Sequence, residues 1–292
     1  MKKLVTLLVC LVLVIGTIGM VGCGDSTFSG NYKEITADSE EVQQFSEKTA
    51  QSEMIDITKG AEIEVEVKGT ASDMKIDLSA NVKFAVVGEG EEAELQGEGK
   101  VKGEVKGEDG SGDGNINFYY TAGKAYVDGK INTKADGETN ETELKHYLAL
   151  DLEAGLGGIA GTAVGMISSR LDVDTGEAMG LIQGNVFANV VAMADAEEGI
   201  KVSLDADARK VKIELSDLTE EEMKISGAVY VVYDEDYNMS GIKVDLKVKD
   251  ADGNELTVYA VIKGYTGKVS VPSEEKLTGY VDASLLLSAM FK

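Results

Sequence analysis

Cysteine and histidine, which carry much nucleophilic and metal chemistry, are nearly absent from this chain of 292 residues. It contains two cysteines, Cys10 and Cys23, and one histidine, His146. A nucleophile needs an activating base beside it, and a cysteine or histidine metal site needs several ligands, so three scattered residues favour neither. We expect a non-enzymatic protein with no catalytic residue and no cofactor. The alternative is an enzyme that uses His146 or carboxylates alone, for which His146→Ala is the first test.

The chemistry that the sequence does indicate is lipidation of Cys23. Two lysines precede an apolar run over residues 4–20, and the following Val21-Gly22-Cys23 completes a pattern that resembles a bacterial lipobox. Such a signal is removed before the cysteine, which is diacylated with chains such as palmitate and becomes the mature N-terminus. An uncleaved transmembrane helix is the alternative, because the run is almost long enough. We expect residues 1–22 to be a signal peptide and Cys23 to anchor the protein to the cell membrane, facing outside the cytoplasm.

The charge of the chain restricts its partners. There are 52 acidic and 28 basic residues, and the formal net charge is −24. An acidic surface repels nucleic acid and anionic headgroups, so we expect no nucleic-acid partner and a membrane contact made by acyl chains alone. No feature of the sequence identifies a protein partner.

One segment partly matches a calcium-binding loop. Asp109, Ser111 and Asp113 stand at the alternating positions of that pattern, but Tyr120 occupies the position where a bidentate glutamate belongs. We therefore expect no metal and interpret the segment as an acidic, glycine-rich hairpin loop, with a calcium site as the alternative.

The elements that position these residues are mostly strands. Apolar and charged residues alternate with a period of two through much of residues 61–152 and 200–271, and an apolar, glycine-spotted stretch with helical spacing lies between them. We predict an α+β fold: a large curved antiparallel sheet, or half-barrel, of about ten to eleven strands with two central helices on its concave face. Residues 23–37 are expected to be a tether and residues 38–292 a single domain with a helical insert over about 153–196.

A glycine-rich strand suggests a place for a ligand. Gly97, Gly99 and Gly103 lie on the inward face of a predicted strand that is otherwise charged outward. Glycine inside a strand marks a bend or a close approach by another group, so these residues predict an indentation. The helical stripe of Gly157, Gly161 and Gly165 or sheet curvature could use this space. The alternative is an open cavity.

Other residues could complete such a cavity. Tyr119, Tyr126 and His146 are candidates for polar groups at its rim. Apolar residues of the predicted helices could line it, although each of them also fits an ordinary core position. These helical candidates are Leu156, Ile159, Met166, Met179, Ile182 and Val186.

The overall pattern resembles the lipoprotein carrier fold of LolA and of the LppX and LprG lipoproteins, and uncharacterised Gram-positive lipoproteins of that type. The resemblance rests on Met20 to Cys23, on the hairpin over residues 119–127, and on a final meander from residue 238 to residue 272. It implies a half-barrel that holds acyl chains between sheet and helices. We expect a lipid-anchored protein that binds a lipid or other hydrophobic molecule there. The alternative is a surface interaction or sensor lipoprotein with a packed core.

Overall fold

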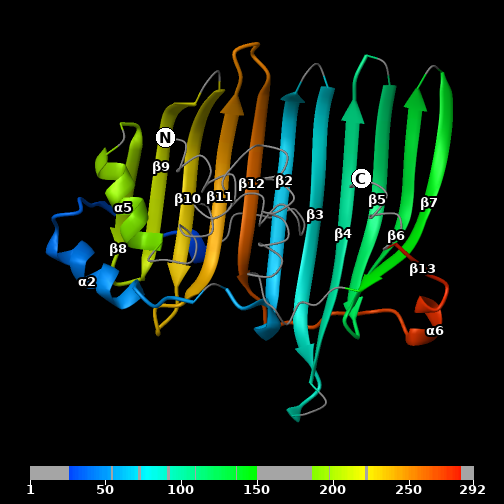
Figure 1. The fold of residues 1–292 in the computed structure, drawn as a ribbon, viewed down its shortest axis with the longest axis horizontal. Helices are drawn as coiled ribbons and strands as arrows, with labels where there is room; N and C mark the ends of the chain where they lie inside the picture. The colour runs from blue at the N-terminus through cyan, green and yellow to red at the C-terminus, as the bar shows by residue number, and fades with distance from the viewer. Residues whose placement is uncertain are drawn as a thin grey trace.

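A single open sheet dominates the computed structural model, which describes residues 26–53, 55–71, 74–90, 93–108, 110–135, 137–149, 186–196, 198–220 and 223–283. Thirteen strands of these residues pair in the order β1-β8-β9-β10-β11-β12-β2-β3-β4-β5-β6-β7-β13. Every pair is antiparallel except β7 with β13 (Figure 1). The predicted large antiparallel sheet is confirmed.

The first half of the chain supplies one side of this sheet as three hairpins. Its long strands are β2 (Ala61–Ala71), β3 (Met74–Val87), β4 (Glu94–Lys106), β5 (Gly110–Thr121), β6 (Lys124–Ala135) and β7 (Glu138–Ala149). The second half supplies β8 (Ile200–Asp205), β9 (Lys210–Glu220), β10 (Met223–Tyr233), β11 (Met239–Lys249) and β12 (Glu255–Gly264). Pairing of β12 with β2 joins the two halves.

The strand count exceeds the predicted ten to eleven because each edge carries a very short strand. These are β1 (Lys33–Glu34), beside β8, and β13 (Val281–Asp282), beside β7. Two residues are too few for any period to be visible in the sequence. Residues 268–271, the end of the second alternating tract in the sequence, are not a strand.

The described part of the second predicted central helix, residues 186–196, does not occupy the predicted central position. The helices α2 (Glu40–Thr49) and α5 (Val186–Ala196) lie together beside β8, near one end of the sheet (Figure 1). A third helix, α6 (Glu274–Leu277), lies beyond β6 and β7 at the other end, and the 3-10 turns are η1 (Ser26–Phe28) and η2 (Ile57–Lys59). The first predicted central helix falls outside the described residues.

The core lies on one face of the β8 to β3 half of the sheet. Ile63, Val65, Val244 and Ile262 are at most 1% exposed. Phe187 of α5 packs edge-on against Phe45 of α2, with ring centroids 4.8 Å apart. The two helices therefore extend this core at the β8 end, where their apolar faces meet.

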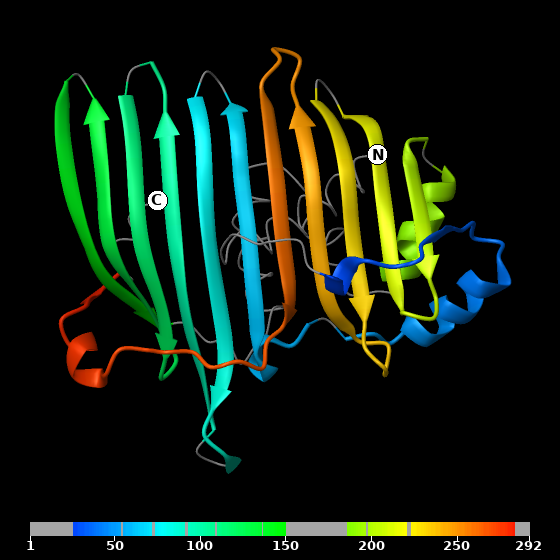
Figure 2. The same ribbon diagram turned by 180° about the vertical axis from the view of Figure 1, so that it is seen from behind.

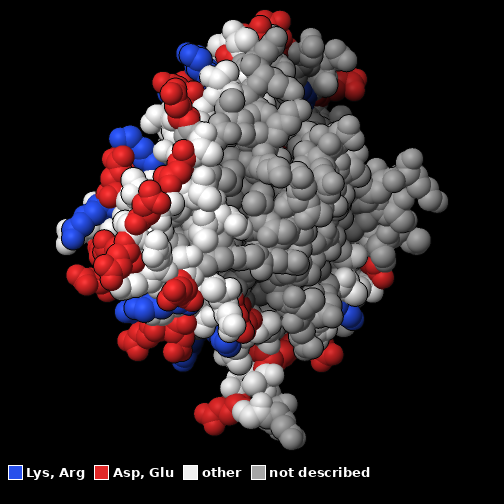
Figure 3. All heavy atoms as spheres, turned by 60° about the vertical axis from the view of Figure 1, so that its left-hand side comes forward, with Lys and Arg blue, Asp and Glu red and all other residues white. Residues whose placement is uncertain are grey.

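The chain after β12 crosses the opposite face of the sheet. Residues 265–280, here called the C-terminal strap, run from the end of β12 to β13 beside β7 (Figure 2). Seven strand spacings, about 34 Å, separate β12 from β13, which sixteen extended residues can span. Acidic side chains outnumber basic ones where the charged surface is visible in Figure 3, in line with the composition.

Removing a core side chain at the junction of the two halves should destabilise the whole sheet. Ile63 is 0% exposed and lies between Val82 and Ile262 in the cross-strand register. We expect Ile63→Ala to lower the free energy of unfolding by about 2–5 kcal/mol, measured by urea denaturation. The control, Val87→Ala at a position that is 41% exposed, should change it by less than about 0.5 kcal/mol. Equal effects of the two variants would contradict this assignment of the core.

Candidate functional site

The sheet sorts the predicted ligand-binding residues onto two opposite faces. Gly99, Phe118, Val127 and His146 are in register across β4 to β7, so their side-chain positions share one face, here called the glycine face. The adjacent register row contains Glu98, Tyr119, Tyr126 and Tyr147. Since neighbouring residues of a strand point to opposite sides, this row forms the other face, here called the tyrosine face.

The structure therefore does not bring the three proposed rim residues together. His146 lies on the glycine face with Gly97, Gly99 and Gly103, whereas Tyr119 and Tyr126 lie on the tyrosine face. The alternation within β5 and β6 was already a usable signal, because each tyrosine directly adjoins an apolar inward residue, Phe118 or Val127.

Side chains of β3 fill the indentation that the glycines create. A Cβ atom on Gly97 would lie 2.8 Å from two ring carbons of Phe84. One on Gly99 would lie 2.6 Å from the Asn81 carbonyl oxygen and 2.7 Å from Val82 Cγ2, and one on Gly103 would lie 2.7 Å from Leu78 Cδ2. Real Cβ atoms do not approach this closely. The glycines thus let β3 approach β4 closely, and there is no room for a side chain at these three positions.

Most of the predicted helical lining cannot be placed against the sheet. Leu156, Ile159, Met166, Met179 and Ile182 lie outside the described residues, as do Gly157, Gly161 and Gly165. Val186 is the first residue of α5, whose described neighbours are β8 and α2.

The glycine face of β4 to β7 is apolar but incompletely buried. Val101, Ile116, Val127, Leu144 and Leu148 are each only partly buried, in contrast to the fully buried residues of β2 and β11 on the same face. His146 has the same intermediate exposure among them. Apolar side chains on several adjacent strands thus present a surface on which a hydrophobic molecule could lie.

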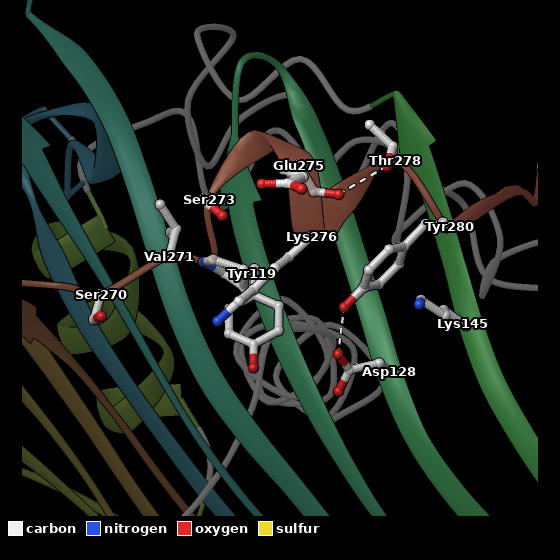
Figure 4. Close-up of a pocket in the computed structure, with 12 residues that line it drawn as sticks. Tyr119, Asp128, Lys145, Ser270, Val271, Ser273, Glu275, Lys276, Thr278 and Tyr280 are labelled. Carbon is white, nitrogen blue, oxygen red and sulfur yellow. Dashed lines mark hydrogen bonds between the residues drawn. The ribbon is translucent and has the colours of Figure 1, made fainter.

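A pocket lies on the tyrosine face, between the C-terminal strap and strands β5 to β7 (Figure 4). It is open to solvent and has a volume of about 810 Å³. Tyr119, Asp128 and Lys145 line it from the sheet. The strap contributes Ser270, Val271, Pro272, Ser273, Glu275, Lys276, Thr278, Gly279 and Tyr280.

Tyr280 attaches the strap to the sheet beside this pocket. Its hydroxyl donates a hydrogen bond to Asp128 Oδ2, and the Asn117 side-chain amide donates to Asp128 Oδ1 at 2.7 Å. The Tyr280 ring also meets the Tyr126 ring edge-on at 5.3 Å, and Leu277 of α6 packs into the same cluster. Tyr126 therefore packs against the strap from the sheet side.

The charged residues that line the pocket are two lysines, Lys145 and Lys276, and two carboxylates, Asp128 and Glu275, and they lie beside the phenols of Tyr119 and Tyr280. Burial, and then the hydrogen bond to Asp128, raises the pKa of the Tyr280 hydroxyl above its ordinary value of 10.0. Burial is also the main cause that raises the pKa of Tyr119. Lys145 Nζ lies 5.4 Å from the centre of the Tyr280 ring, and Lys276 extends from α6 toward Tyr119 (Figure 4). Within the described part of the chain, neither lysine forms an ion pair with a carboxylate.

The partial calcium motif is in a strand. Ser111 and Asp113 belong to β5, where the Asn132 side chain donates a hydrogen bond to Asp113 Oδ2 at 2.9 Å. This extended backbone does not wrap around an ion as a calcium loop does. Asp109 lies outside the described residues, and the described residues contain no group of three or more histidine, cysteine, aspartate or glutamate side chains that could hold a metal ion.

The predicted membrane anchor is not covered by the described residues, which begin at Ser26. Lipidation of Cys23 therefore stays a prediction. Among the helices of the described residues, none is long and apolar enough to cross a membrane.

No protein-family model matches the chain, and no curated protein is significantly similar to it.

Adding one methyl group to the glycine strand tests the close packing by β3. We expect Gly99→Ala to destabilise the protein by about 1–3 kcal/mol, because the new Cβ overlaps the Asn81 carbonyl oxygen and Val82. Gly264→Ala is the control, since a Cβ there has nothing within 4 Å and the backbone is not left-handed. If Gly99→Ala proved as stable as Gly264→Ala in urea denaturation, the indentation would be open after all.

The bond between Tyr280 and Asp128 should contribute to stability in a pH-dependent way. We expect Tyr280→Phe to lower the free energy of unfolding by about 1.5–3 kcal/mol near neutral pH, the typical contribution of a hydrogen bond to a charged group. Because the folded pKa of Tyr280 is raised, the bond's stabilisation is complete below pH 10 and is lost as the pH rises toward the folded pKa. The difference between wild type and variant should therefore shrink above pH 10. A difference that stays constant between pH 8 and pH 11.5 would refute the assignment.

Proposed function

We propose that this protein is a lipid-anchored, extracytoplasmic, non-enzymatic binding protein that holds an acyl chain against the glycine face of β4 to β7. The observation that carries the proposal is the partly buried apolar surface formed by Val101, Ile116, Val127, Leu144 and Leu148. A bound chain would gain about 0.8 kcal/mol for each CH₂ group that it buries.

The placement differs from the cavity expected around Gly97, Gly99 and Gly103. Phe84, Val82 and Leu78 occupy the space beside these glycines, so the ligand would lie over Val101 of β4 and over the apolar residues of β5 to β7. His146 is the polar group nearest to the apolar row, because it pairs directly with Val127. Its imidazole could hydrogen-bond a lipid headgroup or ester oxygen at the end of the chain.

The filling of the indentation also favours a second function. A sheet that is closely packed by its own side chains suits a surface interaction or sensor lipoprotein without a small ligand. In that case the function would reside on the charged surface, where acidic side chains are in the majority.

Native mass spectrometry distinguishes the lipid-binding function from the interaction or sensor function. The full chain is purified from a bacterial host in a gentle detergent, and copurifying lipids are extracted and identified. We expect bound masses of several hundred daltons, and we expect Ile116→Asn combined with Leu144→Asn to abolish them, because both place an amide on the apolar face. The matched control, Asn115→Ser, changes the opposite face of β5 and should retain the lipid. A lipid-free mass that persists after incubation with bacterial lipid vesicles would favour the interaction protein.

A further inference from the structure

The first described residues of the chain are bound to the sheet. Phe28, at the end of η1, is 3% exposed and packs against Val232 and Val261. A Cβ atom on Gly241 would lie 3.3 Å from Phe28 Cζ, so the glycine leaves room for the ring. We call residues 26–35 the N-terminal arm, and its beginning lies over β10 to β12 (Figure 2).

Hydrogen bonds hold the arm at further points. Lys210 Nζ donates to the Ser29 carbonyl oxygen at 2.6 Å, and the Tyr32 hydroxyl donates to the Phe28 carbonyl oxygen at 2.7 Å. The pairing of β1 with β8 follows directly. The arm therefore has a defined position on the sheet from Phe28 onward.

The arm lies on the tyrosine face. Val232 and Gly241 pair in the cross-strand row that continues through Lys263 and Glu98 to Tyr119. The core, to which α2 and α5 contribute, lies on the glycine face, and so does the apolar surface proposed for an acyl chain. The chain therefore enters the domain on the side opposite to that surface.

The expected lipid anchor is very close to the arm in sequence. Cys23 precedes Ser26 by three positions, and three residues span at most about 11 Å. Acyl chains on Cys23 would hold that residue at the bilayer surface. The bilayer surface then lies within about the same distance of Ser26, and so close to the face on which Phe28 is bound.

The charges around Phe28 do not oppose contact with lipid headgroups. Two rows of β8 to β12 lie beneath it, and with the carboxylates paired to them they contain four lysines and three carboxylates: Lys210, Lys212, Lys243 and Lys263, and Asp205, Glu214 and Glu62. The acidic turn over residues 234–236 leads to Tyr237, which packs against Phe45 of α2 on the glycine face. The surface around the arm thus lacks the acidic excess of the whole chain, which would repel anionic headgroups.

We propose that the N-terminal arm turns the tyrosine face of β10 to β12 toward the membrane and the glycine face away from it. The partner of this face is the headgroup layer of the bilayer. The proposal rests on acylation of Cys23, which belongs to the proposed function, and it adds the orientation of the anchored protein. The acyl-chain surface of β4 to β7 is then accessible from the aqueous side and not from the bilayer that holds the anchor.

Fluorescent labels on the two sides of the sheet test this orientation. The mature, acylated protein has no free thiol, so Asp245→Cys on the tyrosine face and Gln43→Cys on α2, both at exposed positions, can each be labelled alone. The proteins are reconstituted into phosphatidylcholine vesicles that contain lipids with a nitroxide quencher on the headgroup. We expect at least about twofold stronger quenching at position 245, because the sheet and a helix about 10 Å thick separate position 43 from the bilayer.

Variants of the arm connect the orientation to Phe28. Phe28→Ser should release the start of the arm, and about twenty glycine and serine residues inserted between Asp25 and Ser26 should extend its reach to about 25 Å. Each change should reduce the difference between the two labels. Ser29→Ala is the matched control and should preserve the difference, because its side chain is exposed and the bond from Lys210 uses its carbonyl oxygen.

Mass spectrometry of the mature protein first establishes whether Cys23 is acylated. Absence of acyl chains would overturn the anchor and the orientation together. With Cys23 acylated, equal quenching of the two labels, stronger quenching at position 43, or an unchanged difference in both arm variants would overturn the orientation alone. Lipid copurification is measured separately, so these outcomes are distinguishable from a failure of the lipid-binding function.

Discussion

The ladder between β2 and β12 is the interaction on which the rest of this fold depends. It pairs Val65 with Ala260 and Ile63 with Ile262, residues that are almost two hundred positions apart. Without it the chain would be two separate sheets, each with a long unpaired strand at its edge. All the other long pairings join strands that follow one another in sequence, so this pairing closes the longest loop among the long strands, and such a non-local contact is expected to slow folding.

The strands could be predicted well because each shows its two faces in its own residues. In β2 and β3 charged and apolar residues alternate, and the structure buries the apolar set, as at Val65 and Val82. The start of helix α2 also has a local cause, because the Ser39 side chain caps it by accepting a hydrogen bond from the Val42 amide at 3.3 Å.

The strap and its pocket could not be predicted, for a different physical reason. Residues 265–280 have no consistent period, and their positions are determined by contacts with strands far away in sequence, such as the bond from Tyr280 to Asp128. The glycines of β4 were ambiguous on similar grounds. Their inward position was readable from the alternation, but whether Phe84 or a ligand used the space depended on cross-strand register, which one sequence does not reveal.

The two edges of so wide a sheet determine whether it can pair with another copy of the chain. A long flat edge can pair with another copy of the chain and begin aggregation. At one edge β13 pairs with β7 only at His146 and Tyr147, and most of β7 before them is exposed and carries Glu138, Glu141 and Glu143. Pairing two such edges would set these carboxylates against those of the neighbouring molecule. At the other edge β1 covers part of β8. The edges of the open sheet therefore disfavour pairing with a strand of another molecule, and the acidic residues oppose such pairing most strongly along β7.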